Sequence, residues 1–394
     1  MEKQQKTMDI KARLSQFDDI RPFCNDEVEE AIEKLLSDEE FFRALRYIKP
    51  NEDREKFSAF MRTCKTKEDF KHILSYDAVM TIARQSAFSL DISGRSRLPK
   101  GNPPCTFISN HRDIILDAAF LNVMLYDVGY GMTQIAIGNN LLIWPWIYTL
   151  MRLNNSFIVH RGLPIRKQLE ASTLLSQYIH FSIKELKESV WIAQREGRCK
   201  DSDDRTQLGV LKMLNMGGEG DIISNITAVN IVPVAISYEI DPCDYLKAKE
   251  YQQKRDNPDF VKSERDDLFN METGILNDKG RIHITLGSPI NESLAALPRD
   301  MGRTETYTAI ANLIDREIYK HYRFYPRNYV AYDLLTGTKR FAEMYSLKDK
   351  QQFETYLQAQ LDKILIPNKD EAFLRMKILE MYTNPLKNHW DTKE

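Results

Sequence analysis

Apolar and polar residues follow three different patterns along the 394-residue chain. In the first stretch, apolar residues recur at helical spacing between many polar ones, for example at Val28, Ile32, Leu35 and Leu36. In the middle stretch, short apolar runs alternate with longer helix-like runs, and after Pro298 the pattern is helical to the end. We therefore expect three parts: a helical region at 1–90, an α/β domain at 91–298 and a second helical region at 299–394.

The middle stretch contains the strands that this pattern predicts. Six short apolar runs are expected to be strands, at 106–109, 134–137, 156–159, 190–193, 230–237 and 281–286. A long helix is expected over Leu163–Glu188, and the charged segment Pro242–Met271 is expected to be a helical excursion on the surface. Residues 91–104, which are rich in Gly, Pro and Ser, are typical of a connection. The predicted fold class is α/β, with a mixed sheet flanked by helices.

Composition and charge restrict the class of protein. The apolar and charged fractions are ordinary for a soluble globular protein. The net charge of -2 excludes bulk electrostatic capture of nucleic acid, because such binding needs an excess of Lys and Arg. The cysteines are scattered and lack metal-ligand spacing, at Cys24, Cys64, Cys105, Cys199 and Cys243. We expect reduced thiols in a cytosolic compartment and no bound metal.

No stretch of the sequence reaches the roughly eighteen apolar residues that a membrane-spanning helix needs. The N-terminus is charged and lacks the apolar core of a signal peptide. The best candidate, Ile135–Leu150, is interrupted by Gly138, two Asn and Pro145. Its aromatic residues would suit a lipid interface, and a buried core helix is an equally good interpretation.

The segment after the first predicted strand carries candidate chemistry, in Asn110, His111, Arg112, Asp113 and, a turn later, Asp117. A histidine can take the proton of a substrate hydroxyl if a carboxylate orients its ring and stabilises the imidazolium. Asp113 and Asp117 are both candidates for that carboxylate. Asp113 is also a good N-cap for the helix that follows, which favours Asp117, with Asp113 as the alternative. Because six positions on one helix would separate the two side chains, His111 must lie in the loop before the helix.

Three further clusters lie at the ends of predicted strands. Counting the segment around His111 as the first cluster, the second ends in His160 and Arg161, and the third contains Glu196, Gly197 and Arg198. The fourth is the apolar run Ile231–Glu239, which contains a proline that should require an edge position or the start of a strand, Pro233. Ligands of open α/β sheets bind beyond the carboxyl ends of strands, so these clusters are expected to converge.

Together the four clusters resemble the motifs of the glycerophospholipid acyltransferases, which share an Asn/Cys-His-x4-Asp motif and three further blocks. The resemblance covers about 103–239 and is greatest to the glycerol-3-phosphate acyltransferase branch, which has a segment similar to 135–161. It implies two catalytic residues, His111 and Asp117, and acceptor or phosphate binding by Arg161, Glu196, Gly197 and Arg198. The chain departs from the pattern in two ways: His111 and Asp117 enclose five residues instead of four, and Arg195 stands where many relatives have Pro.

The resemblance implies an O-acyltransferase of phospholipid biosynthesis. Such an enzyme would move a fatty acyl group from acyl-CoA or acyl carrier protein to the hydroxyl of glycerol-3-phosphate or a lysophospholipid-type acceptor. No covalent enzyme intermediate is needed, because a thioester is already activated, and no cofactor or metal is expected. The expected partners are the thioester donor, the phosphorylated acceptor and a membrane surface, and the expected location is cytoplasmic, at the inner face of the membrane. The alternative is a non-catalytic peripheral protein that binds membrane lipid.

Five basic residues lie near the proposed phosphate-binding residues in the sequence, namely Arg166, Lys167, Arg195, Lys200 and Arg205. Such a run is often a solvated face. It would equally suit an anionic lipid or an acidic acyl carrier protein.

Overall fold

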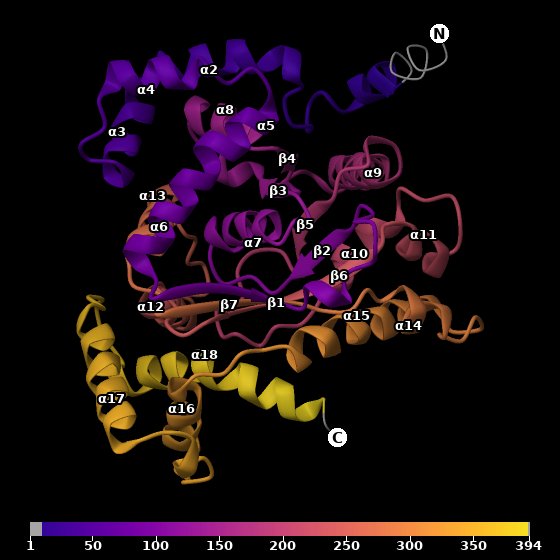
Figure 1. Ribbon diagram of the computed structural model, residues 1–394. Coiled ribbons are helices and arrows are strands. Elements are labelled where there is room, and N and C mark those ends of the chain that lie inside the picture. The colour runs from indigo at the N-terminus through magenta and orange to yellow at the C-terminus, as the bar shows by residue number, and fades with distance from the viewer. Residues whose placement is uncertain (1–9, 393–394) are drawn as a thin grey trace.

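The computed structural model describes residues 10–392 (Figure 1). The N-terminal region is helical, as its spacing of apolar residues predicts. A π-helical stretch, Phe70–Ser75, joins two of its helices. The other helices of this region include α2 (Val28–Leu36), α3 (Glu39–Ile48), α4 (Arg54–Met61), α5 (Lys67–Asp69) and α6 (Tyr76–Ser86).

A seven-stranded sheet forms the centre of the molecule, in the order β1-β7-β6-β2-β5-β3-β4. Its strands are β1 (Ser89–Ser93), β2 (Thr106–Ser109), β3 (Gln134–Gly138), β4 (Ser156–Val159), β5 (Val190–Ala193), β6 (Ile231–Tyr238) and β7 (Arg281–Leu286). Only the β6–β7 pair is antiparallel, and the other pairs are parallel. The predicted fold class, a mixed sheet flanked by helices, is confirmed.

The first strand was not expected from the sequence. β1 pairs in parallel with β7, with Ser89 opposite Arg281, at one edge of the sheet. The expected boundary between residues 90 and 91 therefore falls inside a strand, and the connection expected at 91–104 begins three residues too early. Only two of the five residues of β1 are apolar, because an edge strand is partly exposed, so its pattern is weak.

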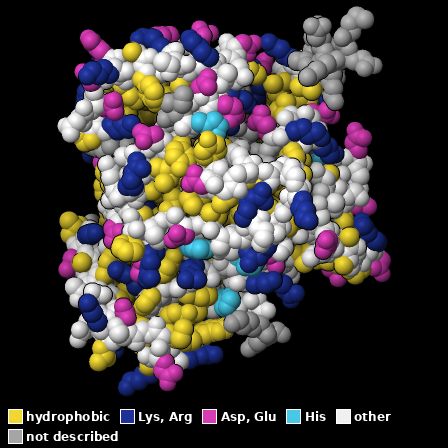
Figure 2. Space-filling view, in the orientation of Figure 1, with side chains coloured by type: hydrophobic (Ala, Val, Ile, Leu, Met, Phe, Trp, Pro, Cys, Tyr) yellow, Lys and Arg dark blue, Asp and Glu magenta, His cyan; other side chains and the backbone are white. Residues whose placement is uncertain are grey.

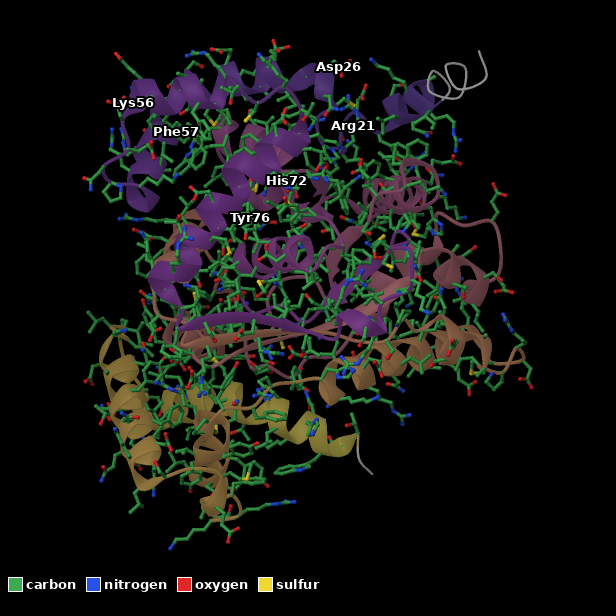
Figure 3. The ribbon with its side chains drawn as sticks, in the orientation of Figure 1. Arg21, Asp26, Lys56, Phe57, His72 and Tyr76 are labelled. Carbon is green, nitrogen blue, oxygen red and sulfur yellow. The ribbon has the colours of Figure 1, made fainter. Side chains whose placement is uncertain are left out.

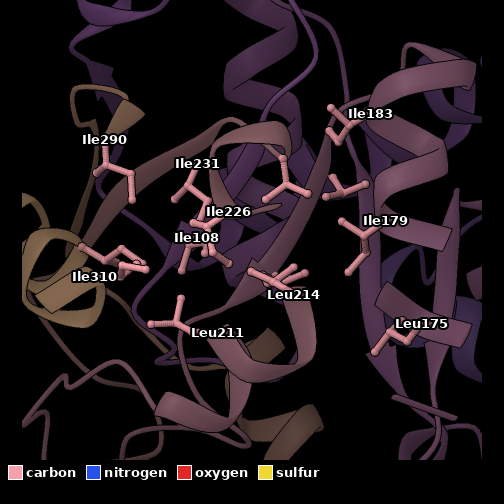
Figure 4. Close-up of a cluster of buried hydrophobic side chains, with 14 of the residues drawn as sticks. Ile108, Leu175, Ile179, Ile183, Leu211, Leu214, Ile226, Ile231, Ile290 and Ile310 are labelled. Atoms are coloured by element: carbon pink, nitrogen blue, oxygen red, sulfur yellow. The ribbon is translucent and has the colours of Figure 1, made fainter. Parts of the chain in front are cut away.

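Each face of the sheet is covered by helices, because strands of a parallel sheet bury both faces. On one face, Ile108 and its neighbours pack against α9 (Ile165–Phe181), α10 (Leu208–Asn215), α11 (Ile222–Ala228) and α15 (Arg303–Lys320) (Figure 4). On the other face, Phe107 and its neighbours pack against α6 and α7 (Leu116–Asp127). The predicted helix Leu163–Glu188 is shorter than expected, since α9 ends at Phe181 and a π-helical stretch continues to Leu186.

The C-terminal region is helical, as predicted, although its first helix belongs to the sheet layer. Tyr307, Ile310 and Ile314 of α15 lie in the same core as the sheet, so the expected boundary at 298/299 does not separate two cores. The remaining helices are α16 (Pro326–Thr336), α17 (Leu347–Asp362) and α18 (Glu371–Asp391). They form a core of their own with α12 (Asp244–Asp256).

The charged segment Pro242–Met271 was expected on the surface, but part of it is buried. Its first helix, α12, buries seven of its residues, among them Asp244 and Lys247. The carboxylate of Asp244 accepts hydrogen bonds from Tyr356 at 2.7 Å and from Tyr382 at 2.8 Å. Burial first, then nearby Asp241, raises the pKa of Asp244 to about 6. The polar residues of α12 are therefore buried with hydrogen-bonding partners, which a sequence pattern does not reveal.

Pro233 was expected at an edge or at the start of a strand, and this prediction is wrong. It is the third residue of β6, which lies between β7 and β2. The ladder between β6 and β7 begins only at the next residue, Val234, which is opposite Leu286. The carbonyl oxygen of Pro233 accepts from the backbone N–H of Gly287, just beyond β7. The nitrogen of Pro233, which has no hydrogen to donate, therefore lies beside the end of β7, where the ladder does not need a donor.

The N-terminal helices pack on the sheet domain through α7 and α8 (Pro145–Leu153). The His72 ring lies against that of Tyr126 of α7, with ring centres 4.5 Å apart and the planes tilted by 37°, and the Tyr76 hydroxyl donates to Asp127 at 2.9 Å. Figure 3 labels His72 and Tyr76. The apolar segment Ile135–Leu150 is not one buried helix. It comprises most of β3, a 3₁₀ turn and the start of α8.

The outer surface carries acidic and basic side chains interspersed with one another on the face that Figure 2 shows. Within residues 10–392, no helix combines the length and the apolar character that crossing a membrane would require. The five cysteines are free, and all except Cys24 are buried.

Candidate active site

His111 lies in the loop between β2 and α7, as the spacing of its candidate partners required. β2 ends at Ser109 and α7 begins at Leu116, so the loop places His111 next to the first turn of the helix. The Nδ1 atom of His111 lies 2.8 Å from Oδ2 of Asp117. The structure thus pairs His111 with Asp117, the residue that the sequence favoured.

The carboxylate of Asp117 is held by the backbone of the same loop. Its Oδ2 accepts from the N–H of Arg112 at 2.6 Å and from the N–H of Asp113 at 2.9 Å. The Asp117 side chain is fully buried, whereas 13% of the His111 side chain is exposed. A carboxylate fixed in this way can hold the imidazole in one orientation and stabilise its protonated form.

Asp113 has a different role from Asp117. Its Oδ1 accepts from the backbone N–H groups of Ile115 at 2.9 Å and Leu116 at 2.8 Å, so it caps the start of α7. Burial, followed by the charge of Asp117, raises the pKa of Asp113. Burial and the same two carboxylates raise the pKa of the nearby Tyr238 hydroxyl.

His111 lines a cavity of about 690 Å³, a size common for small-molecule sites. The cavity lies at the carboxyl ends of β3, β4 and β5 and extends along apolar side chains of α9 and α10, including Leu175, Ile179 and Met213. The rings of Trp191 and His111 form a T-shaped pair, with ring centres 5.8 Å apart and an angle of 72° between the planes. Because Nδ1 of His111 faces Asp117, the second ring nitrogen is the one available to a ligand.

Arg161 and Glu196, from the second and third clusters, meet on the wall of this cavity. Arg161 follows β4, and its backbone N–H donates to Asn139 at 2.9 Å. Its Nε lies 3.6 Å from Oε1 of Glu196. A Cβ on Gly138 would lie only 3.2 Å from the Arg161 guanidinium, so the absence of a side chain there leaves room for it.

The third cluster forms a tight turn after β5. Gly197 has a φ of 70°, a conformation that favours glycine. Arg198 lines the cavity, and its Nη2 donates to Asn270 of α13 (Glu264–Leu276) at 2.9 Å. One residue later, the backbone N–H of Cys199 donates to the carbonyl of His111 at 2.9 Å. The turn is therefore joined directly to the loop that carries the histidine.

The basic run divides into two groups. The side chains of Arg166 and Arg205 are 93% and 73% exposed, and Lys167 is exposed as well. Arg195 and Lys200 instead line the cavity. Lys200 forms an ion pair with the buried Glu250, and burial lowers its pKa to about 8.

Several residues near the site were not predicted. Lys262 and Asp267 line the cavity from the segment that was expected to be a surface excursion. Asp204, beyond the third cluster, is fully buried against Arg112. Lys262 and Asp267 are far from the four clusters in the sequence, and Asp204 stands in a charged run, so none of the three had a local signal. His160, beside Arg161, lines the cavity and pairs with Asp19 at 2.8 Å.

A group with metal-ligand atoms lies away from this cavity. Cys24, Asp26 and Glu27 place ligand atoms within 4.8 Å of one another. Both carboxylates already have cationic partners, since Asp26 pairs with Lys11 at 2.8 Å and Glu27 with Arg21 at 2.6 Å. The group is therefore a set of surface ion pairs in this structure.

Comparisons with known proteins bear on the segment that contains the site. The chain is similar to the crystal structure of the 1-acyl-sn-glycerophosphate (LPA) acyltransferase PlsC from Thermotoga maritima, with 11% sequence identity and a TM-score of 0.36. The similarity covers 74% of this chain and 94% of that chain. No curated protein matches the chain. Residues 89–237 match the family model Acyltransferase, and this segment includes His111, Asp117, Arg161 and Arg198.

Proposed function

We propose that this chain transfers a fatty acyl group from an acyl thioester to a hydroxyl of glycerol-3-phosphate or of a lysophospholipid-type acceptor. The observation that carries the proposal is the His111–Asp117 pair on the wall of a cavity that Arg161 and Arg198 also line. The pair supplies a base for a hydroxyl, and the two guanidinium groups supply a site for a phosphate. The family match of residues 89–237 supports acyl transfer in general.

His111 would act as the general base. With its Nδ1–H donated to Asp117, the neutral ring accepts the hydroxyl proton at Nε2 as the oxygen attacks the thioester carbonyl. The tetrahedral intermediate then collapses, the carbon–sulfur bond breaks, and the imidazolium returns the proton to the leaving thiolate. The products are an ester and a free thiol, and Asp117 remains ionised throughout.

Arg161 and Arg198 would hold the phosphate of the acceptor. A guanidinium group can donate two parallel hydrogen bonds to a phosphate, which fixes direction as well as distance. The contact of Arg161 with Glu196 is 3.6 Å, longer than a hydrogen bond, so the guanidinium retains donors for a ligand. Glu196 would orient a hydroxyl, and the turn at Gly197 would bring the backbone close to the acceptor. Positioning of this kind turns an encounter into an oriented attack.

The remaining parts of the cavity suit the donor. The apolar side chains of α9 and α10 would take the acyl chain, and Lys200 and Lys262 would take a phosphate of its carrier arm. We therefore include acyl-CoA and acyl carrier protein as candidate donors. Because lysophospholipid acceptors and the products reside in lipid, a membrane surface is a further proposed partner.

The test is release of free thiol from a long-chain acyl thioester in the presence of each acceptor. The acceptors are glycerol-3-phosphate, lysophosphatidate and lysophosphatidylcholine, and each is assayed with acyl-CoA and with acyl carrier protein as donor. We expect release that depends on an acceptor, and we expect His111→Ala to abolish it. His283→Asn is the matched control, because His283 lies in β7 and pairs with Ser93 outside the cavity.

Two results would contradict the proposal. If His111→Ala keeps the turnover of the unmodified chain, His111 is not the base. If the chain binds lipid vesicles yet releases no thiol with any donor and acceptor, the non-catalytic lipid-binding alternative replaces acyl transfer.

A further inference from the structure

The loop that follows β5 is held by Asp315 and Tyr319 of α15 and by Tyr322, two residues beyond the end of that helix. Asp315 accepts hydrogen bonds from the backbone N–H of Thr206 at 2.9 Å and from its hydroxyl at 2.5 Å. The Tyr319 hydroxyl donates to the carbonyl oxygen of Asp204 at 2.5 Å, and the Tyr322 hydroxyl donates to the carboxylate of Asp204. Asp315 and Tyr319 are four positions apart and share one side of α15, and Tyr322 follows three positions later, just after the helix ends.

Asp204 connects this loop to the loop that carries His111. Its two carboxylate oxygens accept from the two Nη atoms of Arg112, each at 2.5 Å. The side chains of Arg112 and Asp204 are 7% and 0% exposed. A buried pair with two parallel hydrogen bonds sets the orientation of the arginine as well as its position.

Arg112 is the neighbour of His111, and its backbone is fixed at both ends. Its N–H donates to Oδ2 of Asp117, the same oxygen that lies against Nδ1 of His111. Its carbonyl oxygen accepts from Lys247 at 2.9 Å. A shift of the Arg112 side chain would therefore be transmitted to the hydrogen bond between His111 and Asp117.

We propose that Tyr322 is a positioning residue for His111 and acts through Asp204 and Arg112. The inference rests on the proposed function, because it concerns the orientation of the proposed base. It extends the site beyond residues 89–237, the segment that matches the acyltransferase family model, to Tyr322, which follows α15. Tyr322 does not line the cavity of His111, so its effect should appear in the rate of the chemical step and not in substrate binding.

The physical reason is the hydrogen-bonding demand of the buried Asp204 carboxylate. Its Oδ2 accepts from both Arg112 and Tyr322, so loss of the tyrosine hydroxyl removes one of two donors to that oxygen. A buried ion pair contributes less to stability than to the choice of one geometry, as long as both charges stay in place. Tyr322→Phe keeps the charges of Arg112 and Asp204 and removes only the hydroxyl that donates to Asp204.

The experiment compares Tyr322→Phe with Tyr307→Phe. Tyr307 is a fully buried tyrosine of α15, the helix just before Tyr322, and its hydroxyl has no hydrogen-bond partner within the described part of the chain. We expect Tyr322→Phe to lower kcat between about tenfold and a hundredfold with KM unchanged, as for a misplaced catalytic group. Tyr307→Phe should leave kcat and KM unchanged. Asp204→Asn added to Tyr322→Phe should lower kcat by much less than the product of the two single effects, because both act on one path.

A second readout does not depend on turnover. The ring nitrogen signals of His111 in NMR spectra, identified by their loss in His111→Ala, report its tautomer and its hydrogen bond to Asp117. We expect these signals to move in Tyr322→Phe and to stay in place in Tyr307→Phe. Unchanged signals and unchanged kcat in Tyr322→Phe would overturn the inference. Absence of turnover in the unmodified chain would instead overturn the proposed function, and the NMR comparison would still decide whether Tyr322 positions His111.

Discussion

The side-chain amide of Asn110 pairs with the backbone of Ile236 as a neighbouring strand would. Its Nδ2 donates to the carbonyl oxygen of Ile236 at 2.9 Å, and its Oδ1 accepts from the N–H of Ile236 at 2.8 Å. β2 ends at Ser109 beside β6, so this pairing extends the contact between the two strands by one side chain. The residue immediately before His111 is thereby fixed to the sheet.

Asn110→Ala should therefore destabilise the fold and displace the His111 loop. It leaves a buried N–H and a buried C=O of Ile236 unpaired, which should cost roughly 2–4 kcal/mol. Urea unfolding measures this loss, and the thiol-release assay should show a lower kcat. Asn388→Ala is the control, since Asn388 is buried and its Nδ2 has no partner within the described residues. Equal losses of stability in both variants would contradict the role of the Asn110 pairing.

Asp117→Asn and Asp113→Asn should separate the two carboxylates of the His111 loop. Asp117→Asn removes the charge that would stabilise the imidazolium, so we expect kcat to fall by about a thousandfold or more. Asp113→Asn keeps an oxygen that can accept from Ile115 and Leu116, so we expect less than about a tenfold change. Steady-state kinetics of the two variants provide the test. A greater loss in Asp113→Asn would show that the acid of the pair has been misassigned.

The strands could be predicted from the sequence because their signal is local. The four residues of β2 are buried apolar or small side chains next to a turn, and such a run has one good interpretation. β1 was missed because only its partner β7 makes its weak pattern a strand. Pro233 was misplaced for a similar reason, since its tolerance in an interior strand depends on where β7 ends. Both cases depend on pairing between strands that are far apart in the sequence, and a single sequence does not reveal which strands pair.

The residues of the candidate site also differ in whether a local sequence pattern marks them. His111, Arg161 and Glu196 lie at strand ends, which the sequence marks, and the structure brings them to one cavity. Asp204 and Tyr322 had no such mark, because an aspartate in a charged run and a tyrosine after a helix are ordinary residues on their own. Their importance arises from a buried hydrogen-bond network that joins distant segments.

Arg161→Lys should weaken acceptor binding more than it slows the chemical step. A lysine keeps the positive charge and loses the two parallel donors, so we expect KM for a phosphorylated acceptor to rise about tenfold or more with a smaller change in kcat. Arg166→Lys is the control, because the Arg166 side chain is 93% exposed and lies outside the cavity lining. An Arg161→Lys variant with unchanged KM for every acceptor would remove Arg161 from the phosphate site.

The stability of the chain should carry a pH dependence from one buried carboxyl group of α15. Burial, with a smaller contribution from Asp204, raises the pKa of Asp315 to about 7. In the unfolded chain an aspartate has a pKa of about 3.9, so between about pH 4 and pH 7 the folded state binds more protons than the unfolded state. The free energy of unfolding should therefore fall as the pH rises through this window, by at most about 1.4 kcal/mol per pH unit from this group.

Asp315→Asn should remove this contribution, because the amide oxygen can still accept from Thr206 and carries no titratable proton. Urea unfolding at pH 5 and at pH 7.5 measures the difference, and the variant should lose less stability over this interval than the unmodified chain. Glu305→Gln, an exposed position on the same helix, should keep the original pH dependence. If Asp315→Asn loses as much stability between the two pH values as the unmodified chain does, then Asp315 is already ionised in the folded state at pH 5, and burial has not raised its pKa.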